Sequence, residues 1–298
     1  MYKQLKADLA LLFVAIGWGA SFILTKTSLT ELDTYNFLAT RFIIAFLLSS
    51  TIFIKEMLKI DKKTFKNGNT LGIILFLSFA LQTVGLNYTS ASKSAFITGF
   101  NVVLVPIMAA LMIKSIPKKK TIFSVFLAFI GLGVLTLNGS ITDINIGDLY
   151  TLISSIFFAL YIIYVGKFTH ESKSVPLAVL QMGVVGFLSL ITSFVFEKTV
   201  LPTQSNVWIS ILILSVLCTS GAYIIQSVAQ RYTTPSHTAL IYTAEPVFAA
   251  IFGYILSGEV LTTKGKVGAV LILSGMIITE LDISKIFIKQ KRVVKVKK

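Results

Sequence analysis

The sequence predicts an all-α polytopic membrane protein with ten transmembrane helices, arranged as two inverted five-helix repeats. Three observations predict this class. Of the 298 residues, 55% are hydrophobic and only 13% are charged, whereas soluble domains carry about 25% charged residues. Apolar runs of about 20 residues, long enough to cross a bilayer, recur along the chain. Two octapeptides, YTSASKSA at residues 88–95 and YTTPSHTA at 232–239, repeat one pattern before an apolar run.

The first half is predicted to hold five spans. The first run follows lysines, as the apolar region of a signal peptide does. Its Asp8-Leu9 pair returns as Asp148-Leu149 at the start of the sixth run, so we assign it to the repeat as a true span. Backbone groups in lipid must satisfy one another, which makes each run a helix. The predicted spans are residues 7–29, 34–54, 69–89, 94–114 and 120–138.

The second half is predicted to repeat this order in the opposite direction. Its spans are residues 147–168, 174–196, 206–230, 235–257 and 263–283. Five spans separate the two octapeptides, and an odd number makes the two copies enter the membrane from opposite sides, as in inverted-repeat transporters. We therefore divide the chain into a first repeat (1–140), a second repeat (141–283) and a basic tail (284–298).

The basic residues predict the orientation. With the N-terminus in the cytoplasm, 21 of the 27 Lys and Arg residues fall in cytoplasmic loops or at the termini. Such an excess marks the cytoplasmic side, so both termini are predicted to lie there, in a protein of the cell inner membrane. The tail fits either a surface helix on anionic lipid or a solvated terminus that enforces topology. The net charge of +14 is thereby explained without nucleic acid, and the single Cys218 excludes an internal disulfide.

Aligning the two halves predicts a central cavity. An offset of 144 residues relates Gln82 to Gln226, and an offset of 140 relates Trp18 and Ser21 to Phe158 and Tyr161. Polar stripes recur in both halves and should face inward, since polar groups facing lipid cost several kcal/mol. The aromatic residues Trp18, Phe158, Tyr161, Tyr223 and Tyr242 either stack on a substrate or pack. The predicted cavity residues are Trp18, Ser21, Gln82, Ser94, Thr98, Asn101, Tyr161, Gln226, Thr238, Tyr242 and Glu245.

Three residues in the paired helices invite a mechanistic interpretation. Glu245 lies near the bilayer midplane, where an acid is a functional hypothesis by default. It either binds a substrate amine or a proton, or fixes its helix through a hydrogen bond. Pro106 and Pro246 each free a carbonyl one turn earlier, so each is either a hinge or a static kink.

Five further residues mark helix ends or interiors. Ser92 and Ser236 are predicted N-caps. Lys93 and His237 follow them and either attract an anionic substrate or reach to the interface. Arg41, inside the second span, is predicted to pair with an acid or with helix-end carbonyls.

Enzyme motifs are not recognisable in the sequence. We find no P-loop, no GxSxG and no His/Cys metal spacing. The sequence therefore predicts a non-enzymatic protein with no catalytic residues, no metal and no cofactor.

Together these residues resemble the EamA-type members of the drug/metabolite transporter superfamily. The features that match are Trp18-Gly19, Arg41, Glu245-Pro246, Gly258-Glu259 and the Gly268 to Gly275 region, over residues 7–283. The resemblance implies a ten-helix carrier of the inner membrane that often exports amino acids or other small metabolites. The chain departs from the pattern at Lys114-Ser115-Ile116-Pro117 and at Phe158-Ala159.

The sequence thus predicts a secondary transporter, an exporter of small metabolites such as amino acids, working by alternating access through a midplane cavity. Protons are a candidate coupling ion, and the protein is expected to be a monomer or a homodimer. An antiporter of phosphorylated metabolites or nucleotide sugars is an alternative that needs several cations in the cavity. The sequence is also compatible with an uptake system and with a non-transporting scaffold or sensor.

Overall fold

The computed structural model describes residues 2–112, 114, 119–136 and 145–280. The basic tail and the departure at residues 115–117 lie outside this part of the chain. The first half comprises α1 (Tyr2–Ser28), α2 (Thr34–Ile52), α3 (Ile54–Met57), α4 (Lys62–Tyr88), α5 (Ala91–Thr98), α6 (Asn101–Met112) and α7 (Lys119–Thr136). The second comprises α8 (Ile146–Glu171), α9 (Ser174–Phe196), α10 (Ser205–Ile213), the π-helical η2 (Leu214–Gly221), α11 (Ala222–Ala229), α12 (Pro235–Tyr242), α13 (Ala244–Ser257) and α14 (Thr263–Glu280).

The described chain is helical throughout its regular structure, as predicted, and eight of its helices are long and apolar enough to cross a membrane. Three of these eight each consist of consecutive shorter helices: α5–α6, α10–η2–α11 and α12–α13. The apolar part of α7, Ile122–Leu135, is shorter, and α14 carries charge near its start. The protein is therefore a multi-pass membrane protein, and spans by α7 and α14 remain a prediction.

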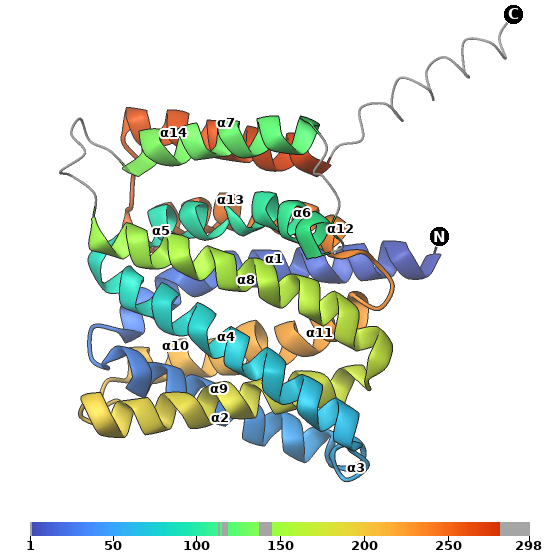
Figure 1. The fold of residues 1–298 in the computed structure, drawn as a ribbon. Coiled ribbons are helices and arrows are strands. Elements are labelled where there is room, and N and C mark those ends of the chain that lie inside the picture. Colours follow the sequence, from blue (N-terminus) through green and yellow to red (C-terminus); the bar gives the residue numbers. More distant parts are fainter. Residues whose placement is uncertain (1, 113, 115–118, 137–144, 281–298) are drawn as a thin grey trace, which may run out of the picture.

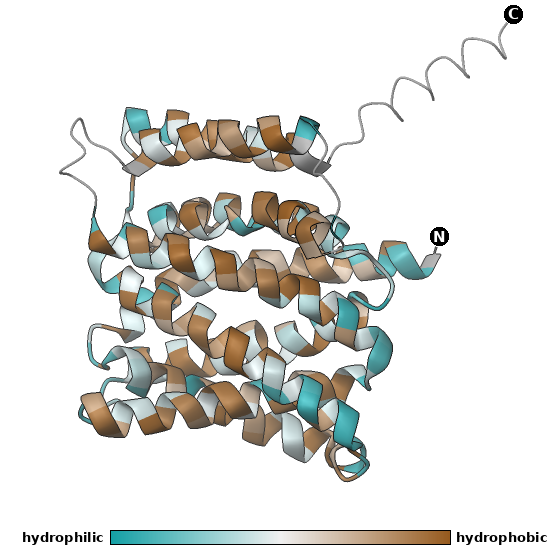
Figure 2. Ribbon diagram, viewed as in Figure 1, coloured by the Kyte–Doolittle hydropathy of each residue, from teal (hydrophilic) through white to brown (hydrophobic). Residues whose placement is uncertain are grey.

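Hydropathy is distributed as a bilayer requires. Large apolar side chains such as Phe13, Phe126 and Phe194 point outward and are exposed, and teal, polar residues gather at the two ends of the bundle (Figure 2). The interior instead holds fully buried polar residues, among them Gln181 and Gln226. A polar interior with an apolar exterior is expected where lipid replaces water, because unpaired polar groups in lipid are costly.

The two halves run in opposite directions. In Figure 1, α1 begins at the right and its counterpart α8 begins at the left. Thr89 links the end of α1 to the start of α8, since its carbonyl accepts from Lys26 Nζ and its hydroxyl donates to Asp148 Oδ1 at 2.8 Å. We call the face at which α1 begins the basic face and the face at which α8 begins the opposite face.

Contacts between the halves follow the same two-fold relation. Helix α1 packs on α13, and its counterpart α8 packs on α5 and α6. Helix α2 packs on its own counterpart α9, and α7 packs on α14, a pair that forms the top layer in Figure 1. Helices α7 and α14 touch through glycines: a Cβ on Gly131 would lie 2.8 Å from the Gly268 carbonyl oxygen. Such small residues permit close approach of membrane helices.

The ends of α5 and α12 correct two predictions. The caps are Ser90 and Thr234, whose hydroxyls accept from the amides of Lys93 and His237. The prediction of Ser92 and Ser236 as N-caps was wrong by two residues.

Two spans are interrupted at equivalent positions. The α5–α6 span lacks regular helix at Gly99–Phe100 and the α12–α13 span lacks it at Thr243, and Gly99 and Thr243 are 144 residues apart. Pro246 lies three residues beyond its interruption, whereas Pro106 lies well inside α6.

Candidate functional site

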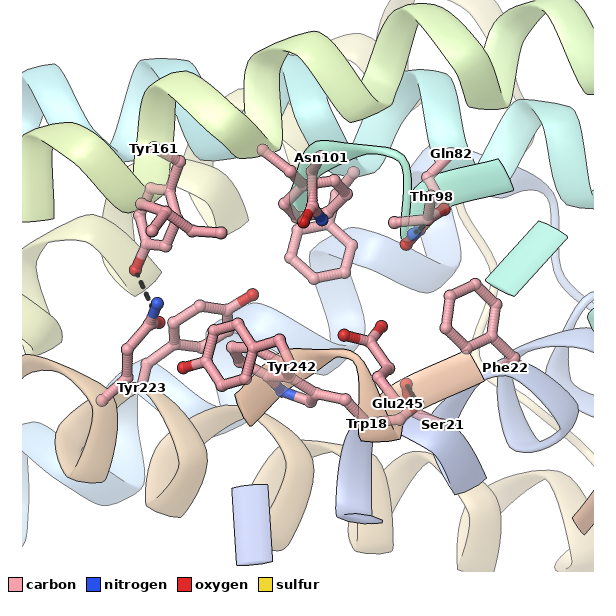
Figure 3. Close-up of a pocket in the computed structure, with 14 residues that line it drawn as sticks. Trp18, Ser21, Phe22, Gln82, Thr98, Asn101, Tyr161, Tyr223, Tyr242 and Glu245 are labelled. Atoms are coloured by element: carbon pink, nitrogen blue, oxygen red, sulfur yellow. Dashed lines mark hydrogen bonds between the residues drawn. The ribbon is translucent and has the colours of Figure 1, made fainter. Parts of the chain in front are cut away.

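A polar and aromatic pocket lies between the halves. It draws its walls from α1, α4 to α6, α8 and α11 to α13 (Figure 3). Its fourteen lining residues are Trp18, Ser21, Phe22, Phe79, Gln82, Thr98, Asn101, Phe158, Tyr161, Ile162, Tyr223, Gln226, Tyr242 and Glu245. Each half contributes seven of these residues, so neither half forms the pocket alone.

The lining residues fall into seven repeat pairs. The 140-residue offset relates Trp18 to Phe158, Ser21 to Tyr161 and Phe22 to Ile162, while the 144-residue offset relates Phe79 to Tyr223, Gln82 to Gln226, Thr98 to Tyr242 and Asn101 to Glu245. Each position that faces the pocket in one half thus has a counterpart that faces it in the other. The pocket therefore lies on the pseudo-two-fold relation between the repeats.

The structure brings together nine of the eleven residues that the sequence placed in a cavity. Ser94 and Thr238, the other two, form a repeat pair of their own and do not line the pocket. Both side chains are fully buried, and their hydroxyls make no hydrogen bond. They lie one turn before Thr98 and Tyr242, on the same helix faces, which explains why helical spacing alone included them.

Sequence reasoning missed Phe22, Phe79 and Ile162. All three are apolar, so a search for polar stripes passes over them. The repeat itself carried the signal: Phe79 lies three residues before Gln82, as Tyr223 lies three residues before Gln226. Extending each alignment by one turn would have identified them.

Aromatic rings form one wall of the pocket around Tyr223. The Tyr223 ring centroid lies 5.4 Å from that of Trp18, 5.9 Å from that of Tyr161 and 6.3 Å from that of Phe79. The Trp18 ring is also 5.1 Å from the Tyr242 ring, edge to face. The indole N–H of Trp18 donates to the Cys218 carbonyl at 2.9 Å, which leaves the ring free to face the pocket while its one donor is satisfied.

The polar wall is only partly satisfied by the protein. Gln82 Nε2 donates to Thr98 Oγ1 at 3.0 Å, and the Tyr161 hydroxyl donates to Gln226 Oε1 at 3.3 Å. Three buried side-chain groups have no hydrogen-bond partner: Asn101 Oδ1, Gln226 Nε2 and the Tyr242 hydroxyl. Buried polar groups are normally paired, so these groups are available to a bound molecule or to water.

Glu245 supplies the only carboxylate among the lining residues. It lies in the first turn of α13, and its carboxylate points into the pocket, across from Asn101 and Thr98 (Figure 3). No residue in the described part of the chain forms a hydrogen bond or a salt bridge with it. Helix α1 approaches closely here, because a Cβ on Gly19 would lie only 2.9 Å from the Glu245 carbonyl oxygen.

Arg41 is fully buried behind the pocket and does not line it. Its Nε donates to Thr219 Oγ1 at 2.7 Å, and its guanidinium lies 5.1 Å from the Phe79 ring centroid and 5.4 Å from that of Phe42. The prediction that it pairs with an acid or with helix-end carbonyls was therefore wrong. Cation–π contacts with two rings take that place.

Three ion pairs join the halves. Lys63 Nζ lies 3.2 Å from Glu171 Oε2 at the basic face, and the other two pairs, one at each face, are related by the repeat. Lys93 Nζ lies 2.6 Å from Asp148 Oδ2 at the opposite face, and His237 Nε2 lies 3.1 Å from Asp8 Oδ2 at the basic face. Lys93 and His237 are repeat counterparts, and so are Asp8 and Asp148. The repeat thus places one cross-half pair at each end of the path through the pocket.

Carboxylates at the opposite face also cap helices of the other half. Glu259 accepts from the Ala91 and Ser92 amides at 3.1 and 3.0 Å, and Glu197 accepts from the Tyr35 and Asn36 amides at 3.0 and 2.8 Å. Glu31 accepts from the Thr203 hydroxyl and amide ahead of α10, and these hydrogen bonds lower the pKa of its carboxyl below the ordinary value. Carboxylates are favourable at helix N-termini.

None of these acids is arranged to hold a metal. Within the described residues, no group of three His, Cys, Asp or Glu side chains is close enough together to bind an ion. The pocket therefore offers hydrogen-bonding groups, rings and one carboxylate as its binding chemistry.

Comparisons with known proteins agree with the repeat. The model of the EamA-like transporter family matches twice, over residues 5–137 and 145–281. An uncharacterized transporter of Archaeoglobus fulgidus is 35% identical over 281 residues, covering 94% of this chain and 88% of that protein. The uncharacterized transporter YyaM of Bacillus subtilis is 28% identical over 92% of this chain and 93% of its own length.

Proteins with lower sequence identity also match over nearly the whole chain. The riboflavin transporter ImpX of Fusobacterium nucleatum is 25% identical over 96% of this chain and all of its own length. A solved crystal structure that is 15% identical superposes with a TM-score of 0.68, over 92% of this chain and 96% of the other, which shows a shared fold. The family model covers both halves of the chain and so covers every wall of the pocket. The chain belongs to the EamA-like transporter family.

Proposed function

We propose that this transporter carries small metabolites such as amino acids outward across the cell membrane through the pocket between its halves. The observation that carries the proposal is that seven repeat pairs surround one pocket. Inverted-repeat transporters bind substrate near the midplane, between repeats that rock about the site. The same proposal places the basic face in the cytoplasm, because cytoplasmic loops are rich in Lys and Arg.

The two ion pairs related by the repeat support alternating access. Opening the pocket to either face requires the halves to separate there, so the pair at that face must break. The Lys93 and Asp148 side chains are 19% and 4% exposed, against 38% and 26% for His237 and Asp8. The pair at the opposite face is thus the more buried of the two, and the capping contacts of Glu259, Glu197 and Glu31 also join the halves there.

Glu245 is the proposed site of proton binding in the transport cycle. It is the one acid among the lining residues, and it lies on α13 beside the helix interruption at Thr243. No nucleotide-binding motif is recognisable in the sequence, so a gradient is the proposed source of energy.

The test is transport by purified protein in proteoliposomes, with and without a pH gradient. The Glu245→Gln variant is expected to lose most of the stimulation by the gradient, because glutamine has nearly the same shape but binds no proton. Glu56→Gln is the matched control, since Glu56 is an exposed carboxyl on α3 and does not line the pocket. Unchanged rates and unchanged pH dependence in Glu245→Gln would remove the proton role.

The antiporter of phosphorylated metabolites or nucleotide sugars is disfavoured by the pocket. Phosphate recognition uses Arg and Lys, and none of the lining residues is a cation. A scaffold or sensor would not require matched lining residues in both halves. It is distinguished from a transporter by the absence of flux in the same proteoliposomes.

A further inference from the structure

From the pocket we infer a substrate class: an organic cation, in which an ammonium group is joined to a small apolar or aromatic body. The inference rests on the proposed transport of small metabolites and, among those metabolites, favours amines over amino acids. A zwitterionic amino acid, by contrast, also needs a partner for its carboxylate. Three features of the molecule favour the cation: the charge of the pocket, its rings, and the position of Arg41.

The charge of the pocket has one sign. Glu245 points into it without a hydrogen-bond or salt-bridge partner in the described structure, and Lys, Arg and His are missing from the lining residues. A carboxylate inside a membrane is costly when alone, and a bound ammonium group compensates it directly. The side-chain oxygen Asn101 Oδ1 is buried and without a hydrogen-bond partner. It lies across the pocket from Glu245 (Figure 3) and offers a second acceptor to the ammonium group.

The rings favour the same charge. Seven of the fourteen lining residues are aromatic, and the faces of aromatic rings attract cations and repel anions. Trp18, Tyr223 and Tyr242 are grouped next to Glu245, with centroid distances of 5.4 and 5.1 Å from the indole to the two tyrosines. An apolar or aromatic body attached to the ammonium group would pack against these rings.

The buried side chain of Arg41 does not line the pocket. Its guanidinium lies against the Phe42 and Phe79 rings and donates to Thr219, and Phe79 is itself a lining residue. Arg41 thus contacts a lining residue without being one itself. A substrate carboxylate would meet only amide and hydroxyl donors there, so an added carboxylate brings a desolvation cost with no cation to offset it.

The experiment compares three ligands that share a phenyl ring and a short chain: phenethylamine, phenylalanine and 3-phenylpropionate. They represent the cation, the zwitterion and the anion. The chain has two tryptophans, Trp18 in the pocket and Trp208, whose N–H donates to the Pro202 carbonyl outside the pocket lining. In a Trp208→Phe background, intrinsic fluorescence therefore reports on Trp18 alone, and the three ligands add no indole signal.

Phenethylamine is expected to bind at least about tenfold more tightly than the other two ligands. Adding Glu245→Gln is expected to abolish that preference, while Glu56→Gln, at an exposed carboxyl on α3, keeps it. Thermal unfolding of each variant verifies that it is folded, and the ligand series on the unaltered pocket tests the inference even if Glu245→Gln does not fold. Equal or tighter binding of phenylalanine or phenylpropionate overturns the inference. So does undetectable binding of the amine at about 10 mM, a weak-affinity limit, or an unchanged preference in a folded Glu245→Gln variant.

Failure of this inference and failure of the proposed function give different results. If liposomes carry phenylalanine or another metabolite but not the amine, the substrate class is wrong and transport stands. If the amine binds with the expected preference but no ligand crosses the membrane, the binding chemistry stands and transport is wrong.

Discussion

At the scale of single residues, one repeat pair differs in charge between the two halves of the pocket. Asn101 and Glu245 occupy equivalent positions in the two halves, and both face the pocket. One half therefore presents a neutral amide where the other presents an acid. Because no other lining residue is an acid, a lysine, an arginine or a histidine, the sign of the charge in the pocket is decided by this single difference.

Exchanging the two side chains tests whether the two positions are equivalent. Glu245→Asn alone is expected to weaken binding of phenethylamine about tenfold or more, because the carboxylate is lost. The double variant Asn101→Glu, Glu245→Asn returns the acid to the equivalent position across the pocket and is expected to recover most of the affinity. Fluorescence titration in the Trp208→Phe background measures both. A double variant that binds no better than the single one would show that the acid cannot be moved between the halves.

At the scale of the elements, the helices around the pocket are held by close backbone approach and by caps from the other half. Gly19 brings α1 against α13 at Glu245 itself, and Glu31, Glu197 and Glu259 cap helices that begin at the opposite face. These contacts fix where the lining residues stand. They belong to pairs of elements far apart in sequence.

Gly19→Ala is expected to destabilise the protein by about 1–3 kcal/mol, because a new Cβ would lie 2.7 Å from the Phe248 Cβ and 2.9 Å from the Ala249 amide nitrogen. Gly17→Ala, two residues earlier on the same helix, is the control: its Cβ would meet nothing closer than Cys218 Sγ at 3.9 Å. Thermal unfolding in detergent compares the two variants. Equal melting temperatures would mean that α1 does not need the glycine for its contact with α13.

The Glu31 cap predicts a pH dependence of stability. The pKa of Glu31 lies below its ordinary value of 4.5 because the Thr203 hydroxyl and amide donate to its carboxylate. A carboxyl with a lowered folded pKa stabilises the protein above its unfolded pKa, and this contribution disappears as the pH falls through the folded pKa. Wild type should therefore melt above Glu31→Gln at pH 7, and the difference should shrink below about pH 4.5. Glu56→Gln, at an exposed carboxyl on α3, should show no such trend.

At the scale of the whole molecule, one ion pair at each face is related to the other by the repeat. Lys93–Asp148 and His237–Asp8 each join a residue of one half to a residue of the other, and each is the repeat image of its counterpart. Separation of the halves at a face requires the pair there to break. We therefore expect these two pairs, together with Lys63–Glu171 at the basic face, to influence the balance between the two open states of the proposed cycle.

Breaking one pair should expose the pocket at that face. In a Cys218→Ser, Ser21→Cys background, a membrane-impermeant maleimide reports access to the pocket from either side. Lys93→Gln is expected to raise labelling from the opposite face several-fold, since a buried pair contributes more than an exposed one. His237→Gln should raise labelling from the basic face by less. Labelling that rises equally at both faces in either variant would contradict the assignment of one pair to each face.

The sequence by itself determined the helical class, the inverted repeat and most of the pocket. Apolar runs and the two offsets are local patterns, and lipid leaves the backbone few conformations besides helix. Nine of the eleven predicted cavity residues line the pocket because helical spacing places them on one face.

Only the tertiary structure decided how those faces meet. It separated Ser94 and Thr238 from the pocket, added Phe22, Phe79 and Ile162, and placed Arg41 against the Phe79 ring and outside the pocket lining. It also paired Lys93 with Asp148 and used Glu259 as a cap for α5. These contacts join residues from opposite halves of the chain, and periodicity within one helix carries no information about which side chain the other half brings against it.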